Sequence, residues 1–270
     1  MSRLTHAVVS LAALDVRRRP QHAAELTSQL LLGEVVRVLG TRPGGQWWRV
    51  EGHADGYRGW VRGWGLVRVP AVRARSWQAK AAARVAVAVA DVRSGPGRGA
   101  LVSPLFLNSR VIAGRRRGGH RRVELPDGRR GWLPVASVAC RGEKPALLER
   151  ILSLLGVPYH WGGRTALGFD CSGFTQQVLA EQGVSLPRDA AHQLRASRRL
   201  SSGEEPEPGD LIFFAAAESP PGHVGIGLGG GYYAHCRGMV MISSLKSSNR
   251  LCDNEMLGQF LAWARPRRGP

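Results

Sequence analysis

The chain has 270 residues, of which 43% are hydrophobic, and a formal net charge of +18. A chain of this length and hydrophobic content can bury two or three cores, which excludes a disordered protein. No apolar run reaches the roughly 20 residues that a membrane-spanning helix needs, so we expect no membrane span.

The four cysteines, Cys140, Cys171, Cys236 and Cys252, show neither a Cys-x-x-Cys pair nor the spacing of a zinc site. We therefore expect no metal site. A disulfide framework is rare in a chain this long, so we expect reduced thiols in a reducing compartment.

The positive charge is concentrated in the first half of the chain. Residues 1–70 carry 10 basic and 5 acidic side chains, residues 71–142 carry 15 and 3, and residues 143–270 carry 13 and 12. The middle segment includes arginines at 115–117 and 121–122, which could bind nucleic acid or an anionic cell-wall polymer through phosphate contacts. No aromatic residues interleave with these arginines, so we favour a solvated hairpin and expect no nucleic-acid partner.

The N-terminal segment, residues 7–14, resembles the apolar part of a signal peptide, but no basic cluster precedes it and it runs directly into Asp15. We interpret residues 7–16 as a strand instead. Because no clear signal peptide is present, we expect a cytoplasmic protein, with a secreted or wall-associated protein as the alternative.

Short alternating segments punctuated by Gly and Pro follow, a pattern typical of strands and turns. The expected strands are residues 7–16, 34–39, 47–50 and 59–61.

This pattern then recurs along the chain. Asp-Val-Arg at residues 15–17 returns at 91–93, and Gly-Trp at 59–60 returns at 131–132. Two copies of a small all-β unit explain the recurrence, each closed into a barrel that protects its strand edges. The layout resembles a pair of bacterial SH3-type domains, which we place at residues 1–70 and 71–142.

The third part, residues 143–270, changes in character to an α+β domain, because helices come first and strands of an antiparallel sheet follow. The expected helices are residues 145–155, a helix that begins at Cys171 and a helix that begins near Asp189; the expected strands are residues 211–214, 223–228, 232–236 and 240–242.

Cys171 is the candidate nucleophile. Asp170 suits the N-cap of a helix, and Phe174, Val178 and Leu179 recur at the spacing of one buried face. A thiol at a helix N-terminus feels the positive end of the helix dipole, which favours the thiolate. The alternative is structural, since free cysteine often behaves as a small buried hydrophobic residue.

A cysteine nucleophile needs a base and a group that orients the base. His223 opens one expected strand and His235 lies on the next, so antiparallel pairing can bring the two imidazoles together on one face. We predict His223 as the base and His235 as the orienting residue. His192 is a rival base on a helix, and His160 is a weaker rival for an indirect role.

Five ordered motifs make the third part resemble the NlpC/P60 family of papain-like cysteine peptidases. The motifs are Tyr159-x-Trp161-Gly162-Gly163, Asp170-Cys171-Ser172-Gly173-Phe174, Leu186-Pro187-Arg188-Asp189, Gly209-Asp210-Leu211-Ile212-Phe213-Phe214 and His223-Val224-Gly225-Ile226. With two SH3-like units before it, the chain is similar to three-domain γ-D-glutamyl-L-diamino acid endopeptidases, which cut peptidoglycan stem peptides between D-Glu and the diamino acid.

The resemblance implies a cysteine hydrolase that recycles bacterial cell-wall (murein) peptides and needs no cofactor. It implies Cys171 as nucleophile, His223 as base and His235 as the third residue. The other implied oxyanion or substrate-binding residues are Tyr159, Trp161, Asp170, Ser172, Arg188 and Asp189, and Glu34 and Tyr57 of the first SH3-like unit, which would roof the cleft and hold the free amine of an N-terminal L-Ala.

Three other functions stay open at this stage. The chain could be a wall-binding module with an inactive peptidase domain, or it could bind nucleic acid through the basic second unit. Within enzymes, an amidase or an acyltransferase on the same fold is the alternative. The oligomeric state is not fixed by the sequence.

Overall fold

The computed structural model describes residues 5–140, 142–216 and 219–267, and it divides into two compact units, Met1–Glu143 and Lys144–Pro270. Each unit is built around its own sheets, and the first unit holds two of them. The three-part division at residues 70 and 142 stays a prediction.

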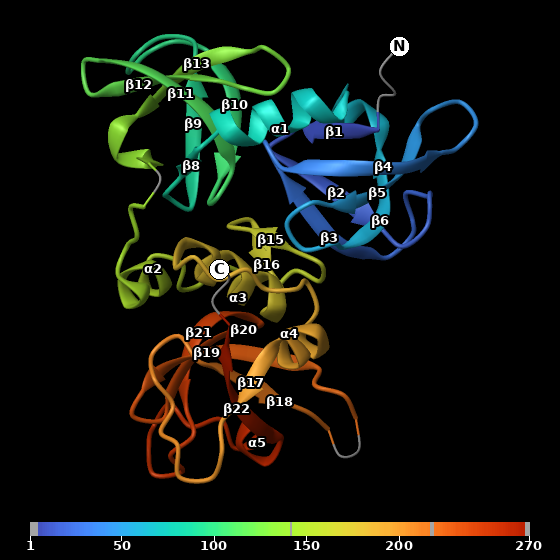
Figure 1. The fold of residues 1–270 in the computed structure, drawn as a ribbon. Coiled ribbons are helices and arrows are strands. Elements are labelled where there is room, and N and C mark those ends of the chain that lie inside the picture. Colours follow the sequence, from blue (N-terminus) through green and yellow to red (C-terminus); the bar gives the residue numbers. More distant parts are fainter. Residues whose placement is uncertain (1–4, 141, 217–218, 268–270) are drawn as a thin grey trace. The chain divides into compact units, whose positions relative to one another are not determined.

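The first sheet of unit 1 has seven strands in the order β3-β2-β6-β5-β4-β1-β7 (Figure 1). Its strands are β1 (His6–Val9), β2 (Ala13–Arg17), β3 (Leu26–Leu31), β4 (Val35–Thr41), β5 (Trp47–Gly52), β6 (Arg58–Arg62) and β7 (Leu66–Val69), with a short 3-10 helix, η1 (Gly63–Gly65), between the last two. All of the pairings are antiparallel.

The second sheet repeats this strand order as β10-β9-β13-β12-β11-β8-β14. Its strands are β8 (Ala83–Val85), β9 (Val89–Arg93), β10 (Leu101–Phe106), β11 (Arg110–Arg117), β12 (His120–Glu124), β13 (Arg130–Pro134) and β14 (Val138–Ala139), with η2 (Val135–Ser137) before the last. The match extends to irregularities, because the β4–β5 pairing shifts register after Val38 and the β11–β12 pairing shifts after Ala113. The sequence repeat therefore has a counterpart in the topology.

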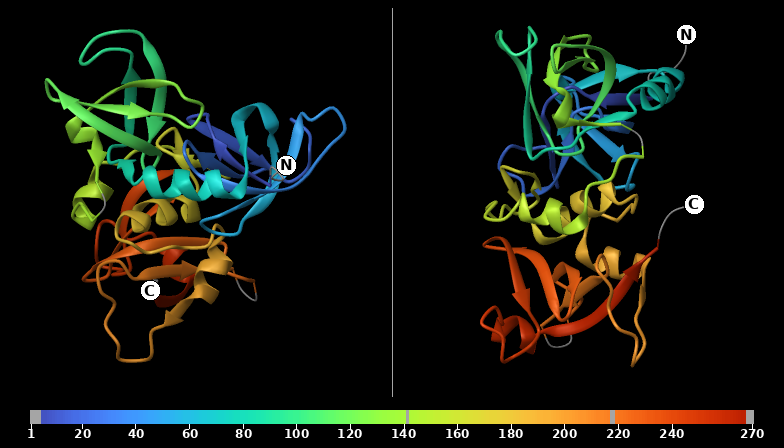
Figure 2. Two further views of the ribbon diagram at one scale, coloured as in Figure 1. Left: turned by 45° about the horizontal axis from the view of Figure 1, so that its top comes forward. Right: turned by 90° about the vertical axis from the view of Figure 1, so that its left-hand side faces the viewer.

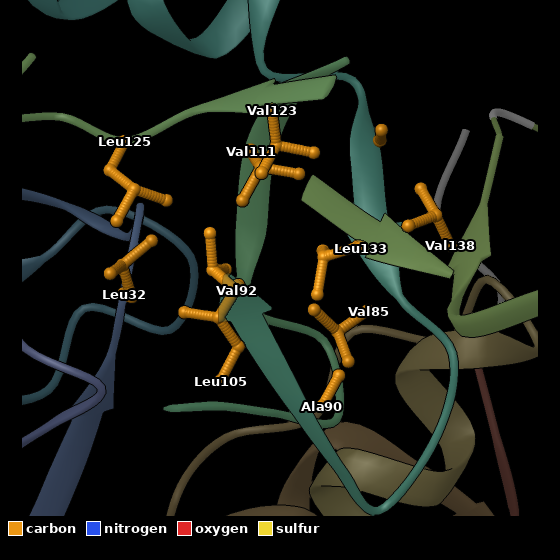
Figure 3. Packing of buried hydrophobic residues seen from close by; sticks show 11 residues of the cluster. Leu32, Val85, Ala90, Val92, Leu105, Val111, Val123, Leu125, Leu133 and Val138 are labelled. Atoms are coloured by element: carbon orange, nitrogen blue, oxygen red, sulfur yellow. The ribbon is translucent and has the colours of Figure 1, made fainter. Parts of the chain in front are cut away.

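The core of the second sheet is aliphatic and takes one residue from the first. Leu105, Val111 and Leu133 are fully buried in it, as Figure 3 shows. Leu32, from the turn between β3 and β4, lies in the same cluster and is 0% exposed. Its carbonyl also accepts a hydrogen bond from the Arg110 backbone N–H at 2.9 Å. The two sheets of unit 1 are therefore joined by shared packing.

Helix α1 (Ala71–Lys80), shown in cyan in Figure 2, connects the two sheets and packs on the first one. Its Ala74 is buried against Val8 and Val35, and the indole of Trp77 donates to the Gly33 carbonyl at 2.9 Å. The sequence prediction missed this helix, because only one of its residues is fully buried and its hydrophobic periodicity is correspondingly weak.

The expected strand at residues 7–16 is two strands, β1 and β2, which pair with different neighbours. Strand β1 ends at Val9, and the next backbone N–H, that of Ser10, donates a hydrogen bond to the Gly65 carbonyl at 3.0 Å. The sequence did not reveal this break, because both strands contribute buried apolar residues and the apolar run is continuous.

Unit 2 is an α+β structure, as expected, with a six-stranded antiparallel sheet in the order β17-β22-β18-β19-β20-β21. Its elements are α2 (Leu147–Leu152), β15 (Arg164–Thr165), β16 (Gly168–Phe169), α3 (Cys171–Glu181), α4 (Ala190–Ala196), β17 (Ser197–Arg199), β18 (Leu211–Phe214), β19 (His223–Gly229), β20 (Tyr232–Arg237), β21 (Met239–Ser244), α5 (Asn254–Gly258) and β22 (Phe260–Pro266). The fully buried Phe174 and Val178 of α3 belong to the core of this unit.

The four strands expected in unit 2 correspond to β18, β19, β20 and β21. Strands β17 and β22 and helix α5 were missed. The helix expected at residues 145–155 is shorter in the structure, where α2 covers only Leu147–Leu152. Its Arg150 is buried and pairs with the buried Glu181 of α3, so the inner side of this helix carries a charge as well as apolar residues. No helix among the described residues has the length and apolar character for crossing a membrane.

The second core offers a test on one strand. Leu105 and Leu101 both lie on β10, but Leu105 is 0% exposed and Leu101 is 53% exposed. Leu105→Ala should lower the free energy of unfolding of unit 1 by about 2–5 kcal/mol, because it leaves a cavity. Leu101→Ala should change it by less than about 0.5 kcal/mol in the same denaturant titration. Equal effects of the two substitutions would contradict the fold.

Candidate active site

Cys171 is the first residue of α3, as expected. Asp170 is the N-cap, and its carboxylate accepts a hydrogen bond from the Gly173 N–H at 2.6 Å. The other carboxylate oxygen accepts from the Gly162 N–H at 3.0 Å. One side chain therefore fixes both the start of the helix and the glycine pair after Trp161.

Arg188 completes this arrangement from the segment before α4. Its guanidinium donates to both carboxylate oxygens of Asp170, at 3.0 and 2.5 Å, and to the Ser172 hydroxyl at 2.9 Å. The Arg188 side chain is 1% exposed and that of Asp170 is 11% exposed. Asp170, Ser172 and Arg188, which the family resemblance implies as oxyanion or substrate-binding residues, thus form a buried network under the helix terminus.

The Cys171 sulfur lies against the backbone on both sides of His223. Its thiol donates to the Gly222 carbonyl over 3.9 Å, and the Val224 backbone hydrogen-bonds the sulfur. Strand β19 therefore begins beside the nucleophile candidate.

Burial raises the pKa of the Cys171 thiol to about 11, and the negative charge of Asp170 adds to this. The direction is opposite to the one expected from the helix terminus. Desolvation of a thiolate outweighs the stabilisation by the backbone N–H groups and the Arg188 charge at a site 7% exposed. The resting side chain is consequently a thiol at neutral pH.

The two histidines meet as expected. His223 Nε2 lies 2.8 Å from His235 Nδ1, and their rings are nearly perpendicular at 82°. His235 is fully buried, and its Nε2 lies 3.1 Å from the hydroxyl of Ser243 on β21. Three polar side chains from neighbouring strands thus form one hydrogen-bonded row.

Both imidazoles are neutral at pH 7. Burial lowers the pKa of His223 to about 3, helped by the charge of His235, and burial lowers the pKa of His235 to about 4. A neutral imidazole carries one N–H, so each hydrogen bond in the row fixes a tautomer. If His235 donates to Ser243, its Nδ1 accepts from His223 Nε2–H and leaves His223 Nδ1 as a proton acceptor.

A cavity of about 520 Å³ opens beside this row. His223, Tyr159 and Cys236 are among the residues that line it. Burial and the neighbouring Cys171 raise the pKa of the Tyr159 hydroxyl, so it remains a proton donor. The Cys236 thiol donates to the Phe169 carbonyl at 3.2 Å, and all four cysteines of the chain are free.

Two further expected residues lie at the surface of unit 2. Trp161 is 60% exposed. Asp189 is the N-cap residue of α4, but its side chain makes no cap hydrogen bond and instead lies 3.3 Å from the imidazole of His192. The rival base His192 is therefore on the outside of α4, with a partner of its own.

Glu34 and Tyr57 belong to unit 1. The carboxylate of Glu34 accepts from the Leu31 N–H at 3.1 Å. Tyr57 packs at the edge of the first core, and its backbone N–H donates to Asp55. Both residues are half-buried. Their expected role toward the peptide stays a prediction.

Sequence reasoning missed Ser243. A serine near the end of a strand carries no signal of its own, although its place opposite Tyr233 puts it on the same sheet face as His235. Among the described residues, no group of three or more His, Cys, Asp or Glu side chains is placed to hold a metal ion.

An α+β unit with a cysteine at a helix N-terminus and a histidine at the start of the adjoining strand has the layout of a cysteine peptidase. Residues 156–254 match the NlpC/P60 family, and residues 16–66 match the bacterial dipeptidyl-peptidase SH3 domain. The chain therefore carries an SH3 domain of this type and an NlpC/P60 peptidase domain, and it is mostly β structure with few helices.

Curated relatives resemble part of the chain. Gamma-D-glutamyl-L-lysine dipeptidyl-peptidase of Bacillus subtilis is 38% identical over 97 residues, which are 35% of this chain and 32% of the relative. A probable endopeptidase p60 of Listeria innocua is 44% identical over 86 residues, 32% of this chain and 18% of the relative. The matches thus span a third or less of these relatives.

A solved structure resembles almost the whole chain. An NlpC/P60 family protein from Bacillus cereus superposes with a TM-score of 0.81 at 22% identity, covering 98% of this chain and 100% of that chain. At this identity the likeness establishes the fold.

The buried pair under α3 predicts a large loss of stability on Arg188→Met. The substitution leaves the Asp170 carboxylate in the interior without its cation, which should lower the free energy of unfolding of unit 2 by about 3–5 kcal/mol in a denaturant titration. The control is Arg198→Met, since Arg198 pairs with Glu204 at the surface and should leave the midpoint nearly unchanged. A neutral effect of Arg188→Met would contradict the network.

The raised thiol pKa predicts how Cys171 reacts with iodoacetamide. Below a pKa of about 11 the thiolate fraction rises about tenfold per pH unit, so the labelling rate of native protein should climb steadily from pH 6 to 10. Mass spectrometry of the Cys171 peptide measures the rate, with glutathione as the reference thiol. A rate that stays constant between pH 6 and 8 would instead indicate a preformed thiolate.

Proposed function

We propose that this chain is a cysteine endopeptidase that hydrolyses the γ-D-glutamyl–diamino acid bond of short peptidoglycan stem peptides with a free N-terminal L-Ala. The observation that carries the proposal is the position of the Cys171 sulfur, which hydrogen-bonds with the backbone of Gly222 and Val224. These residues flank His223, which is hydrogen-bonded to His235. The relatives named gamma-D-glutamyl-L-lysine dipeptidyl-peptidase support the choice of bond.

The first step is attack by the Cys171 sulfur on the γ-carbonyl carbon of D-Glu. Because thiol and imidazole are both neutral at rest, the proton passes from sulfur to His223 as the carbon–sulfur bond forms. The imidazolium donates Nε2–H to His235 Nδ1, and His235 donates onward to the Ser243 hydroxyl. This row orients the base and disperses its charge.

The tetrahedral intermediate carries a negative charge on the former carbonyl oxygen. The backbone N–H of Cys171 at the start of α3 and the hydroxyl of Tyr159 are its proposed donors. The raised pKa of Tyr159 keeps that hydroxyl protonated and able to donate.

Collapse of the intermediate breaks the amide bond and leaves a thioester on Cys171. His223 returns its proton to the departing amine of the diamino acid. A water molecule then gives a proton to His223 and attacks the thioester, which releases the γ-D-glutamyl product and restores the thiol.

Two sets of residues are proposed to shape the substrate site. Trp161 and Asp189, which lie at the surface of unit 2, are proposed to contact the substrate. Ser172 and Arg188 are buried around Asp170, so they are proposed to shape the site only by holding the start of α3. Glu34 and Tyr57 of the SH3 domain are proposed to hold the free amine of L-Ala, which would restrict the enzyme to short peptides.

The second sheet is proposed to be another SH3-type barrel. It has the same strand order as the first sheet and the same shift in register in its hairpin. The chain would then consist of two SH3-type barrels, at residues 1–70 and 71–142, and a papain-like peptidase domain at residues 143–270.

Incubation with L-Ala-γ-D-Glu-L-Lys, or with its diaminopimelate counterpart, tests the activity by mass spectrometry. The native chain should release L-Ala-D-Glu, and Cys171→Ala should abolish the release while leaving the fold intact. Cys252→Ala is the matched control, because Cys252 is a partly exposed thiol near α5. Turnover by Cys171→Ala at the native rate would end the nucleophile assignment.

The same peptides acetylated on the L-Ala nitrogen test the role of the SH3 domain. Cleavage of only the free-amine form would support Glu34 and Tyr57 as amine ligands. Cleavage of both forms would keep the peptidase and discard the amine site, whereas cleavage of neither would favour an amidase or acyltransferase.

A further inference from the structure

The β11–β12 hairpin of unit 1 carries five arginines close together, at residues 115–117 and 121–122 (Figure 1). The first three are exposed and the other two are half-buried.

The acidic residues of the second sheet each form an ion pair with an arginine outside this set of five. The ion pairs join Arg93 to Asp91, Arg129 to Asp127 and Arg130 to Glu124. Within the part of the chain that the structure describes, no carboxylate pairs with the five hairpin arginines.

The arrangement is unfavourable without a counter-charge. Arg116 and Arg121 lie directly opposite each other across the hairpin. Like charges at such a position destabilise a strand pair, because the side chains are only about 5 Å apart at their Cβ atoms. An anion between the two guanidinium groups would turn this repulsion into two attractions.

The first sheet supplies an internal comparison. Its β4–β5 hairpin occupies the same place and has the same register shift, but the pair at the position of Arg116 and Arg121 is Thr41 and Trp48. There, Arg37 and Arg58 both pair with Glu51. At this position the first copy therefore has an uncharged pair, whereas the second copy has two arginines that face each other.

A groove beside the hairpin gives the arginines a common target. It has a volume of about 440 Å³, and Arg115, Arg122 and Arg130 line it together with Ile112 and Val123. Its one acidic residue, Glu124, is already paired with Arg130 at 2.8 Å. A bound anion would therefore meet two guanidinium groups without carboxylate partners.

We propose that this hairpin and groove bind a base-free anionic polymer whose repeating units are joined by phosphodiesters. The planar guanidinium fork matches two phosphate oxygens at once, and several arginines in a row suit a repeating charge. Single-stranded nucleic acid needs exposed aromatic faces for its bases. The phenyl and indole rings of the second sheet do not offer them, because Phe106 and Trp132 are buried and the Arg115 guanidinium lies over the Trp132 ring at 6.0 Å.

Fluorescence anisotropy with the full chain tests the proposal at low and at physiological salt, without peptide substrate. The probe is labelled poly(glycerol phosphate) of about 20 units; a 20-base-pair DNA duplex and hyaluronate are competitors. Arg116→Ser combined with Arg121→Ser should weaken binding of poly(glycerol phosphate) about tenfold or more and flatten its salt dependence, since two phosphate contacts are lost. The same double variant should melt at an equal or higher temperature, because it removes the like-charge pair.

The matched control is Arg42→Ser combined with Arg49→Ser, which removes the same charge from the hairpin region of the first sheet and should change affinity less than about twofold. Equal losses in the two double variants, or no binding of poly(glycerol phosphate), would overturn the proposal. A duplex that binds tenfold more tightly than poly(glycerol phosphate) would overturn it in favour of nucleic acid, and equal competition by hyaluronate would overturn the preference for phosphate.

Discussion

The buried pair of Asp170 and Arg188 is the interaction on which the peptidase unit depends. The Asp170 carboxylate holds the first turn of α3 through Gly173 and the preceding loop through Gly162, while the Arg188 guanidinium compensates its charge from the far side. Helix start, loop and the segment before α4 are therefore positioned by one ion pair. A buried pair is costly to assemble and more costly to break, so its value lies in fixing one geometry at the nucleophile.

The side chains of Cys171, His223 and His235 are uncharged at neutral pH. The thiol of Cys171 and the two imidazoles are neutral because each is desolvated, and the helix terminus does not reverse this. In the proposed mechanism, the nucleophile rests as the less reactive thiol and charge forms only when a substrate carbonyl is in place. The row from His223 through His235 to Ser243 then provides hydrogen bonds for the new positive charge.

Much of this could be predicted from the sequence where the signal was local. Asp170 before an apolar helical face gave the start of α3, and two histidines on neighbouring strands gave their contact. Signals that depend on tertiary structure were out of reach. The pKa of Cys171 follows burial, which no motif encodes, and Ser243 takes its place only through strand pairing. Helix α1 escaped because Ala74 and Trp77 contact a sheet distant in sequence.

Leu32 has a consequence for how the two sheets of unit 1 unfold. Its side chain completes the core of the second sheet although it belongs to a turn of the first (Figure 3). A chain that kept the second sheet without the first would lose the Leu32 side chain from that core and leave a cavity there. The second sheet therefore depends on the first for part of its core, and the two sheets are expected to unfold together.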